Sequence, residues 1–238
     1  MPKLKYKRIL LKLSGEVFKG DLAAGIDGNI LMNFAKDIKK LQDMGVQVGI
    51  VIGGGNIWRF RDFQHLKLDR VTSDSIGMLA TCMNSLALES ALKSAGADVR
   101  AVTNFPCEKA METYIPKRAQ THLKKGRIVI FAGGTGHPFF TTDSAAALMA
   151  LEMGCDVLLK ATKVDYVYDK DPMKFKNAKK FTKMTFMQVL EQKLGVMDLT
   201  CASMCMDGNM PMVVFNLEKA GNIEKVVKGE TIGTLITN

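Results

Sequence analysis

Histidine and tryptophan are scarce in this chain of 238 residues, which holds three histidines and one tryptophan. The histidines are scattered, and no two of the five cysteines form a Cys-x-x-Cys pair. Zinc sites and disulfide frameworks rely on such clusters, so the sequence argues against both and predicts no metal ligands. It also offers no Ser-His-Asp or Cys-His catalytic set. Most cysteines are expected to be small buried hydrophobic residues.

Long apolar runs are missing as well. The longest have the length of a strand, so no segment is expected to span a membrane. Near the N-terminus Lys12 interrupts the apolar stretch from Ile9 to Leu13, which is too short for the core of a signal peptide. A cytoplasmic protein is therefore expected.

Aromatic residues make up only 7% of the chain, and no RNA- or DNA-binding motif is present. The net charge of +9 is carried mainly by lysine. It has two interpretations: affinity for nucleic acid or polyphosphates, or simply a solvated surface rich in lysine. Without a motif we favour the second and expect no nucleic-acid partner. An anionic small substrate remains compatible with the charge.

Glycine punctuates the chain in a regular way. A stretch with helical spacing of apolar residues ends at a glycine, and a β-type run follows at once. This rhythm predicts βαβ units and an α/β fold, with a mainly parallel sheet covered by helices on both faces. No linker is evident, so residues 1–238 are interpreted as one domain, with an N-terminal half to about residue 151 and a C-terminal half from about 152. The glycines are Gly45, Gly96, Gly126, Gly154 and Gly208.

Two other stretches have recognisable patterns. Ser73 to Ala95 is expected to be a long helix, with the cap-like residues Thr72 to Asp74 at its start. Val164 to Pro172 is expected to form a small hairpin or a turn-rich excursion. Five methionines near the C-terminus are expected to fill the core or to form a subunit contact rather than a cofactor site: Met197, Met204, Met206, Met210 and Met212.

Gly53-Gly54-Gly55-Asn56 follows the predicted strand Val46 to Ile52. Three glycines in a row let backbone N–H groups approach a ligand closely, and ligands collect at the carboxyl ends of parallel strands. Bare amides at such a place suit a phosphate. The alternative is a tight turn that needs positive φ, for which one glycine would serve.

A second glycine loop, Gly133 to Pro138, leads through Thr141 and Thr142 into an alanine-rich helix. The N-terminus of that helix offers free N–H groups and a partial positive charge. Asp143 is unexpected there, because a carboxylate repels a bound anion. Two roles remain open for it: a helix cap, or a group that orients lysines and substrate at a reacting centre.

Lys12 lies at the end of the predicted strand Arg8 to Leu13, just before Ser14 and Gly15. A lysine buried in a strand is costly unless an anion meets it; the alternative is an edge strand with the lysine in water. Lys160 and Lys163 follow a later strand. Neither glycine loop fits a P-loop or a dinucleotide motif. Two phosphate-binding loops and several lysines point to phosphoryl transfer between two phosphorylated ligands, which relies on positioning and charge stabilisation.

Several stretches together resemble the amino-acid kinase family, and within it the bacterial uridylate kinases. The resemblance covers nearly the whole chain and implies a three-layer αβα sandwich. The stretches are Lys12 to Glu16, Gly53 to Asn56 with Arg59, Asp74 with Gly77 to Thr81, Thr135 to Asp143, and Lys160 to Asp165 with Asp171-Pro172.

The resemblance implies transfer of the ATP γ-phosphoryl group to UMP, giving UDP and ADP in pyrimidine nucleotide biosynthesis, with Mg²⁺ accompanying ATP. It implies a cytoplasmic homohexamer with GTP as activator and UTP as inhibitor, and Gly20 to Gly25 matches the segment tied to GTP activation. His137 stands where the family usually has Asn, and Tyr166 where it has Gly.

The family's site residues carry over position by position. The implied catalytic residues are Lys12, Asp143 and Lys163. The implied ATP ligands are Lys12, Leu13, Ser14, Gly15, Gly55, Arg59, Thr162, Tyr168 and Asp171. The implied UMP ligands are Gly54, Asp74, Thr135, Gly136, His137, Pro138, Phe139, Phe140, Thr141 and Thr142.

Two other functions remain open. One is a kinase of the same fold that phosphorylates an acylamino acid or carbamate, against which Asp74 and the loop from Thr135 to Asp143 argue. The other is a nucleotide-binding regulator or storage protein without turnover, against which the intact lysines argue.

Overall fold

The computed structural model describes residues 4–59, 66–217, 219 and 221–238, and within them one large sheet runs through both halves of the chain. Its strands lie in the order β4-β3-β5-β2-β1-β6-β10-β11-β9. All pairings in this sheet are parallel except that of β10 with β11. A separate ribbon pairs β7 with β8 antiparallel. The strands are β1 Arg8–Leu13, β2 Gln47–Ile52, β3 Val99–Thr103, β4 Glu112–Thr113, β5 Ile128–Ala132, β6 Val157–Thr162, β7 Val167–Tyr168, β8 Lys180–Phe181, β9 Lys183–Thr185, β10 Met212–Asn216 and β11 Thr234–Thr237.

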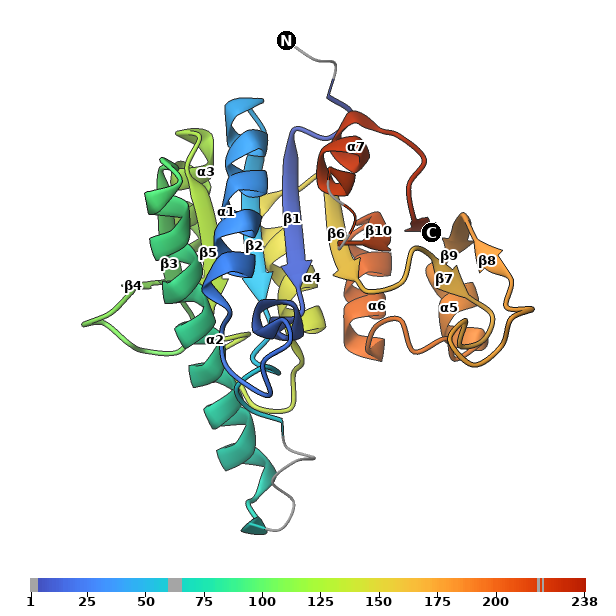
Figure 1. Cartoon of the computed structure of the whole chain (residues 1–238), viewed down its shortest axis with the longest axis horizontal. Helices are drawn as coiled ribbons and strands as arrows, with labels where there is room; N and C mark the ends of the chain where they lie inside the picture. Colours follow the sequence, from blue (N-terminus) through green and yellow to red (C-terminus); the bar gives the residue numbers. More distant parts are fainter. Residues whose placement is uncertain (1–3, 60–65, 218, 220) are drawn as a thin grey trace.

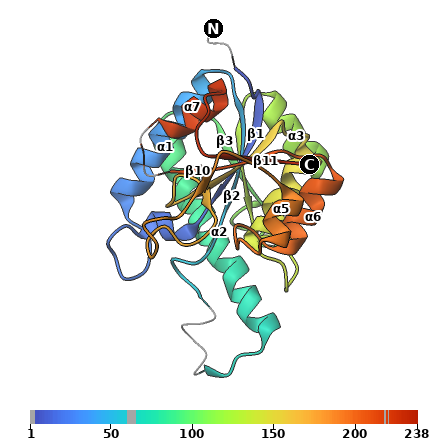
Figure 2. The same cartoon turned by 90° about the vertical axis from the view of Figure 1, so that its right-hand side faces the viewer.

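Helices cover both faces of the sheet, as Figure 2 shows when viewed along it. One layer contains α1, α2 and α7, and the other contains α3, α5 and α6 (Figure 2), with α4 packed against α3 and α6. The predicted α/β fold with three layers is confirmed. The helices are the 3-10 helix η1 Gly15–Lys19, α1 Gly28–Asp43, α2 Arg70–Ser94, α3 Pro116–Lys124, α4 Thr142–Met153, α5 Phe186–Glu191, α6 Leu199–Asp207 and α7 Asn222–Lys228.

The central strand β1 separates two hydrophobic cores. Its side chains alternate between the faces, so Ile9, Leu11 and Leu13 enter the core beneath α1 and α7. Leu10 points the other way, into the core beneath α4. All four are fully buried, and each contributes on the order of 2 kcal/mol relative to an exposed position. By the same alternation Lys12 points to the α4 face, where a charge needs a partner.

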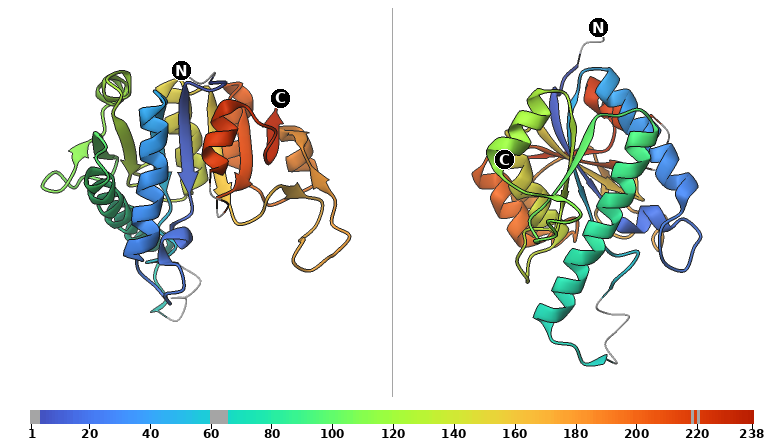
Figure 3. Two further views of the ribbon diagram at one scale, coloured as in Figure 1. Left: turned by 45° about the horizontal axis from the view of Figure 1, so that its top comes forward. Right: turned by 90° about the vertical axis from the view of Figure 1, so that its left-hand side faces the viewer.

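The carboxyl ends of β1 and β2 lie at one edge of the sheet, at the bottom of Figure 1. The loops after β1, β2 and β5 gather there, and α2 extends beyond the strands on the same side (Figure 3). The start of β1 lies at the opposite edge (Figure 1). Among the described residues, no helix combines the length and the apolar character needed to cross a bilayer.

Most predicted helix ends carry the expected left-handed glycine, since Gly45, Gly96, Gly126 and Gly154 have φ of 83°, 80°, 77° and 61°. For Gly208 the expectation is wrong, because its φ is −84°. Asn209 takes the left-handed conformation instead, with φ of 47°, which asparagine tolerates better than most residues.

Two predicted boundaries are wrong. The long helix α2 begins at Arg70, not near Ser73, because the Asp69 side chain accepts a hydrogen bond of 3.0 Å from the Thr72 N–H. The hairpin or turn-rich excursion predicted within Val164 to Pro172 extends to Phe181, because β7 pairs with β8 beyond the lysine-rich segment of residues 173–179. The short elements η1, β4, β8, β9, α7 and β11 were not predicted, since two- to seven-residue segments carry too little periodicity.

The cysteines and C-terminal methionines behave as hydrophobic side chains. Cys82, Cys155, Cys201 and Cys205 are buried, Cys107 is half-buried, and all are free thiols, as predicted. Of the methionines with two possible roles, Met210 and Met212 lie in the core beneath α4, and Met197, Met204 and Met206 pack against it. The core role is confirmed, and a subunit contact stays a prediction.

Candidate active site

Lys12 and Lys160 stand side by side in the middle of the sheet. They are direct Cα partners in the parallel pairing of β1 with β6, so both side chains leave the same face. Asp143, from the first turn of α4, lies against both ammonium groups. Its Oδ1 is 2.7 Å from Lys12 Nζ, and its Oδ2 accepts a hydrogen bond from Lys160 Nζ. We call Lys12, Asp143 and Lys160 the charge cluster.

The charge cluster is largely shielded from water, with side-chain exposures of 13%, 15% and 12%. Burial alone favours the neutral carboxyl of Asp143, but the two lysines outweigh it and hold its pKa below the ordinary value. Burial lowers the pKa of Lys160 despite the neighbouring carboxylate, and the charge of Lys12 adds to that effect. The cluster thus concentrates positive charge beside a single anion.

The structure decides between the two roles that the sequence leaves open for Asp143. Thr141 caps α4, because its hydroxyl accepts hydrogen bonds from the N–H groups of Asp143 and Ser144 at 3.0 and 3.4 Å. The cap interpretation of Asp143 is therefore wrong, and its carboxylate serves the two lysines. The edge-strand alternative for Lys12 is wrong, because β1 lies inside the sheet and the side chain is largely buried. Its partner in this structure is the Asp143 carboxylate, and contact with a phosphate stays a prediction.

The first glycine loop is built for close approach. Gly53, Gly54 and Gly55 are absent from the residues with positive φ, so the tight-turn alternative is wrong for all three. A Cβ on Gly54 would come within 2.9 Å of both the Ala80 Cβ and the Gly77 carbonyl oxygen of α2. One on Gly15 would overlap the Gly53 carbonyl oxygen. The loops after β1 and β2 therefore contact each other and α2 through backbone atoms.

A buried pair of amides supports this loop. Asn84 of α2 donates a hydrogen bond of 2.8 Å to the Gly53 carbonyl oxygen and exchanges hydrogen bonds with Asn56. Asn56 also donates to the Gly25 carbonyl oxygen at 2.8 Å. Asn84 is fully buried, and this residue was not predicted from the sequence, because a single asparagine within a helix gives no signal.

The second glycine loop does need positive φ, with values of 76°, 58° and 79° at Gly133, Gly134 and Gly136. Two side chains fix it in place: Thr81 accepts from the Gly133 N–H at 2.8 Å, and Asn104 donates to the Gly134 carbonyl oxygen at 2.7 Å. Farther along, Phe139 adopts φ of 71°, a strained conformation for a side chain of its size.

The two glycine loops border a cavity of about 200 Å³, here called the glycine cavity. It brings together most of the predicted UMP ligands and adds side chains from α2. Its lining is Gly54, Gly55, Trp58, Ser73, Asp74, Gly77, Met78, Thr81, Gly134, Thr135, His137, Phe140, Thr141 and Thr142.

Asp74 ties α2 to the second loop. Its Oδ2 accepts hydrogen bonds of 2.7 Å from both Arg70 Nε and the Phe139 N–H. The Arg70 guanidinium also lies 5.5 Å from the centre of the Phe139 ring, a cation–π distance. Arg70 was not predicted; its spacing of four residues from Asp74 on a helix is the signal that could have found it.

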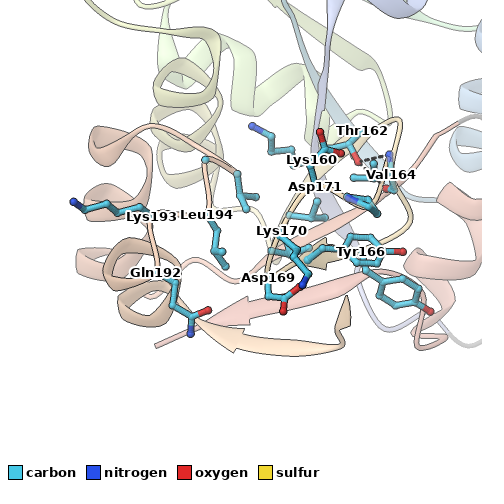
Figure 4. Close-up of a pocket in the computed structure, with 16 residues that line it drawn as sticks. Lys160, Thr162, Val164, Tyr166, Asp169, Lys170, Asp171, Gln192, Lys193 and Leu194 are labelled. Carbon is cyan, nitrogen blue, oxygen red and sulfur yellow. Dashed lines mark hydrogen bonds between the residues drawn. The ribbon is translucent and has the colours of Figure 1, made fainter. Parts of the chain in front are cut away.

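A larger cavity of about 660 Å³ lies between β7 with its flanking residues and the segment after α5. We call it the hairpin cavity, and Figure 4 shows its lining. Lys160 reaches it from the charge cluster, and the predicted ATP ligands Thr162, Tyr168 and Asp171 line it. The segment from Gln192 to Val196, which was not predicted as part of a site, forms the opposite wall.

Arg59 is held at the first glycine loop. Its Nε donates to the Gly55 carbonyl oxygen at 2.9 Å, and its guanidinium forms an ion pair with Glu16. Lys163 is exposed and lines a third cavity, of about 660 Å³, together with Glu16, Lys36 and Lys40. The structure thus places Lys160, rather than Lys163, beside Lys12 and Asp143.

No group of three His, Cys, Asp or Glu side chains within residues 4–59, 66–217, 219 and 221–238 could hold a metal ion. Asp143, the acidic residue of the charge cluster, is committed to two lysines. A Mg²⁺ cage made by the described side chains alone is therefore not present.

Comparison with known proteins identifies the family of this fold. The model of the amino acid kinase family matches residues 7–216. A crystal structure of UMP kinase from Bacillus anthracis superposes with a TM-score of 0.95 at 40% identity, covering 98% of this chain and 96% of the other. UMP kinase from Ureaplasma parvum gives 0.93 at 34% identity, with 99% and 100% covered. Uridylate kinase from Archaeoglobus fulgidus gives 0.75 at 30% identity, with 96% and 99% covered.

Proposed function

Since this chain belongs to the amino acid kinase family, we propose that it is a UMP kinase, transferring the γ-phosphoryl group of ATP to UMP to give ADP and UDP for pyrimidine nucleotide synthesis. The observation that carries the proposal is the charge cluster of Lys12, Asp143 and Lys160 between two cavities. Lys160 lines the hairpin cavity, and Thr142, next to Asp143, lines the glycine cavity.

The hairpin cavity is the proposed site of ATP. Its volume of about 660 Å³ falls within the usual range for small-molecule sites. Thr162, Tyr168 and Asp171 line it at the base and ribose end, and the triphosphate points toward Lys160 and Lys12. Ser14, Gly15, Gly55 and Arg59 complete the phosphate end, together with the backbone at Leu13.

The glycine cavity is the proposed site of UMP. Asp74 has the chemistry to accept hydrogen bonds from ribose hydroxyls, as carboxylates do in other nucleotide sites. Gly54 borders the cavity with bare backbone, beside which the α-phosphate is placed, and the loop from Thr135 to Thr142 holds the uridine. This loop includes Gly136, His137, Pro138, Phe139 and Phe140.

The chemical step relies on positioning and charge. Negative charge is spread over the transferring group in the transition state, and Lys12 and Lys160 lie where both ammonium groups can stabilise it. Asp143 holds the two lysines apart from each other and in register. No general base is required, because the phosphate of UMP is already an anion at neutral pH. Lys163 stays a predicted catalytic residue, and its position in the third cavity favours a lesser role.

Mg²⁺ is proposed to accompany ATP and to neutralise charge on its phosphates. Ions of this kind are usually held by substrate phosphates, water and one or two carboxylates. The resemblance to uridylate kinases supports three further proposals. The protein is a homohexamer in the cytoplasm, GTP activates it through the segment from Gly20 to Gly25, and UTP inhibits it.

A coupled assay of ADP release tests the proposal. Mg-ATP is offered with UMP, CMP, dTMP and GMP, with and without GTP or UTP, and EDTA controls remove Mg²⁺. We expect turnover with UMP well above the other acceptors. Turnover with an acylamino acid or carbamate instead would identify a different kinase, and binding of both nucleotides without ADP release would indicate a regulator or storage protein.

A further inference from the structure

Asp198, at the N-terminus of α6, bonds to three groups on two helices. Its Oδ1 accepts from the Cys201 N–H at 2.8 Å, which caps α6. The same oxygen accepts from the Ser144 hydroxyl at 2.8 Å, and Oδ2 accepts from the Thr141 hydroxyl. A helix cap needs only the first of these bonds. The other two reach α4, which packs directly against α6.

The two helices adjoin segments that line different cavities. Thr141 and Thr142, at the start of α4, line the glycine cavity, and the next residue, Asp143, belongs to the charge cluster. Asp198 comes two residues after Val196, the end of the wall of the hairpin cavity. The carboxylate therefore links the wall of one cavity to the end of the loop that borders the other.

The bond to Thr141 has a fixed direction. The Thr141 oxygen already accepts two backbone N–H groups of α4, so its own proton must go to an acceptor. Asp198 is that acceptor. A carboxylate accepts at both oxygens, whereas an amide accepts at one and donates at the other.

We propose that Asp198 is a positioning residue that couples the hairpin cavity to the glycine cavity. It sets the first turn of α4, and with it Asp143 and the loop end at Thr141, relative to the segment from Gln192 to Val196. This inference rests on the proposed function, in which the two cavities hold donor and acceptor. Occupation of one cavity then changes the affinity of the other through this carboxylate.

Asp198→Asn is the informative variant. Asparagine caps helices well, so its oxygen keeps the bond to the Cys201 N–H and the α6 cap survives. The amide NH₂ then faces Thr141, whose oxygen meets a third donor while its own proton has no acceptor. Asp27→Asn is the matched control, since Asp27 caps α1 through the N–H groups of Asn29 and Ile30 and lines neither cavity.

Three measurements are made on the full chain: kcat and KM for UMP and Mg-ATP, thermal unfolding, and UMP titration followed by the fluorescence of Trp58 in the glycine cavity. The titration is repeated with a non-hydrolysable ATP analogue. In the wild type we expect the analogue to tighten UMP binding at least about 5-fold, within the usual range of coupling between sites. We expect Asp198→Asn to lower kcat at least about 10-fold and to remove this tightening, and Asp27→Asn to keep both.

An Asp198→Asn enzyme with wild-type kcat and intact tightening, altered only in its unfolding temperature, would overturn the inference. If that variant does not fold, Ser144→Ala removes one of the two bonds to α4 at little structural cost. It should weaken kcat and tightening in the same direction, and wild-type values for both would overturn the inference equally. Absence of ADP release by the wild type refutes the proposed function instead; the fluorescence coupling still decides the role of Asp198.

Discussion

The Nζ atom of Lys12 lies 2.7 Å from Oδ1 of Asp143. The lysine comes from the central strand and the aspartate from a helix on one face of the sheet. An ion pair therefore connects the sheet to this helix layer. Lys160 completes the cluster from the adjacent strand.

Lys12→Ala should lower kcat at least about 100-fold, because one source of charge stabilisation in the transition state is lost. The coupled ADP-release assay measures it, with Lys124→Ala at the end of α3 as a control for loss of a surface charge. Near-normal kcat with a raised KM for ATP would show instead that Lys12 only binds the donor.

Lys160→Ala should reduce kcat at least about ten times more than Lys163→Ala. The reason is position: Lys160 contacts Asp143, whereas Lys163 is exposed and lines the third cavity. The two variants remove the same chemical group three positions apart, so each controls for the other. A larger loss of kcat in Lys163→Ala than in Lys160→Ala would show that Lys163, not Lys160, is the second catalytic lysine.

Gly54→Ala should raise KM for UMP and lower the free energy of unfolding by about 1 to 3 kcal/mol, because the new methyl group is forced against α2. Gly55→Ala should perturb stability less, since the nearest atom to its Cβ, Nε of Arg59, is 3.4 Å away on a flexible side chain. Kinetics and urea unfolding distinguish the pair. Full activity of Gly54→Ala would remove this loop from the acceptor site.

Asp74→Ala should mainly weaken UMP binding, raising KM for UMP about 10-fold or more while kcat changes less. The carboxylate also anchors the Phe139 N–H, so Asp74→Asn, which can still accept that bond, should show the smaller loss. Trp58 fluorescence gives the affinity directly. An unchanged KM for UMP in the alanine variant would take Asp74 out of the acceptor site.

Asp143→Asn should lower the free energy of unfolding by about 3 kcal/mol at pH 7, because two buried lysines lose their counter-charge. The pKa of Asp143 is held below its ordinary value of 3.8 in the folded protein, so its stabilisation is present above that value. The stabilisation disappears as the pH falls through the folded pKa. Urea unfolding of wild type and variant from pH 7 to 3 should show a difference that shrinks only at the acid end; a constant difference would contradict the ion-pair assignment.

The sheet and most of its strands could be predicted from the sequence, because buried parallel strands such as β2 and β5 are continuous apolar runs bounded by glycine. The glycine loops and Lys12 could be identified for the same reason, since each follows or ends such a run. What the sequence could not supply is register. By spacing alone, Lys160 and Lys163 are equally good candidates for the lysine beside Lys12. The pairing of β1 with β6 places Lys160 there.

Side-chain contacts and strand pairings between segments that are distant in the sequence could not be predicted either. Asn84, Arg70 and Asp198 are single polar residues on helices, and their partners lie from four to fifty-seven positions away. The hairpin boundary was misplaced for a similar reason: β7 is two residues long, and its partner strand lies beyond a polar, lysine-rich segment. Short strands of this kind are defined by pairing more than by their own composition.

The register of β1 with β6 also bears on how the chain folds. Lys12 and Lys160 are like charges placed directly opposite each other on neighbouring strands, an arrangement that opposes pairing until a counter-charge arrives. Asp143 precedes β6 in the sequence, so α4 can dock on the N-terminal half before β6 is added. The closing of the sheet between its two halves is then expected to be a late step of folding, and Asp143→Asn should slow refolding as well as speed unfolding.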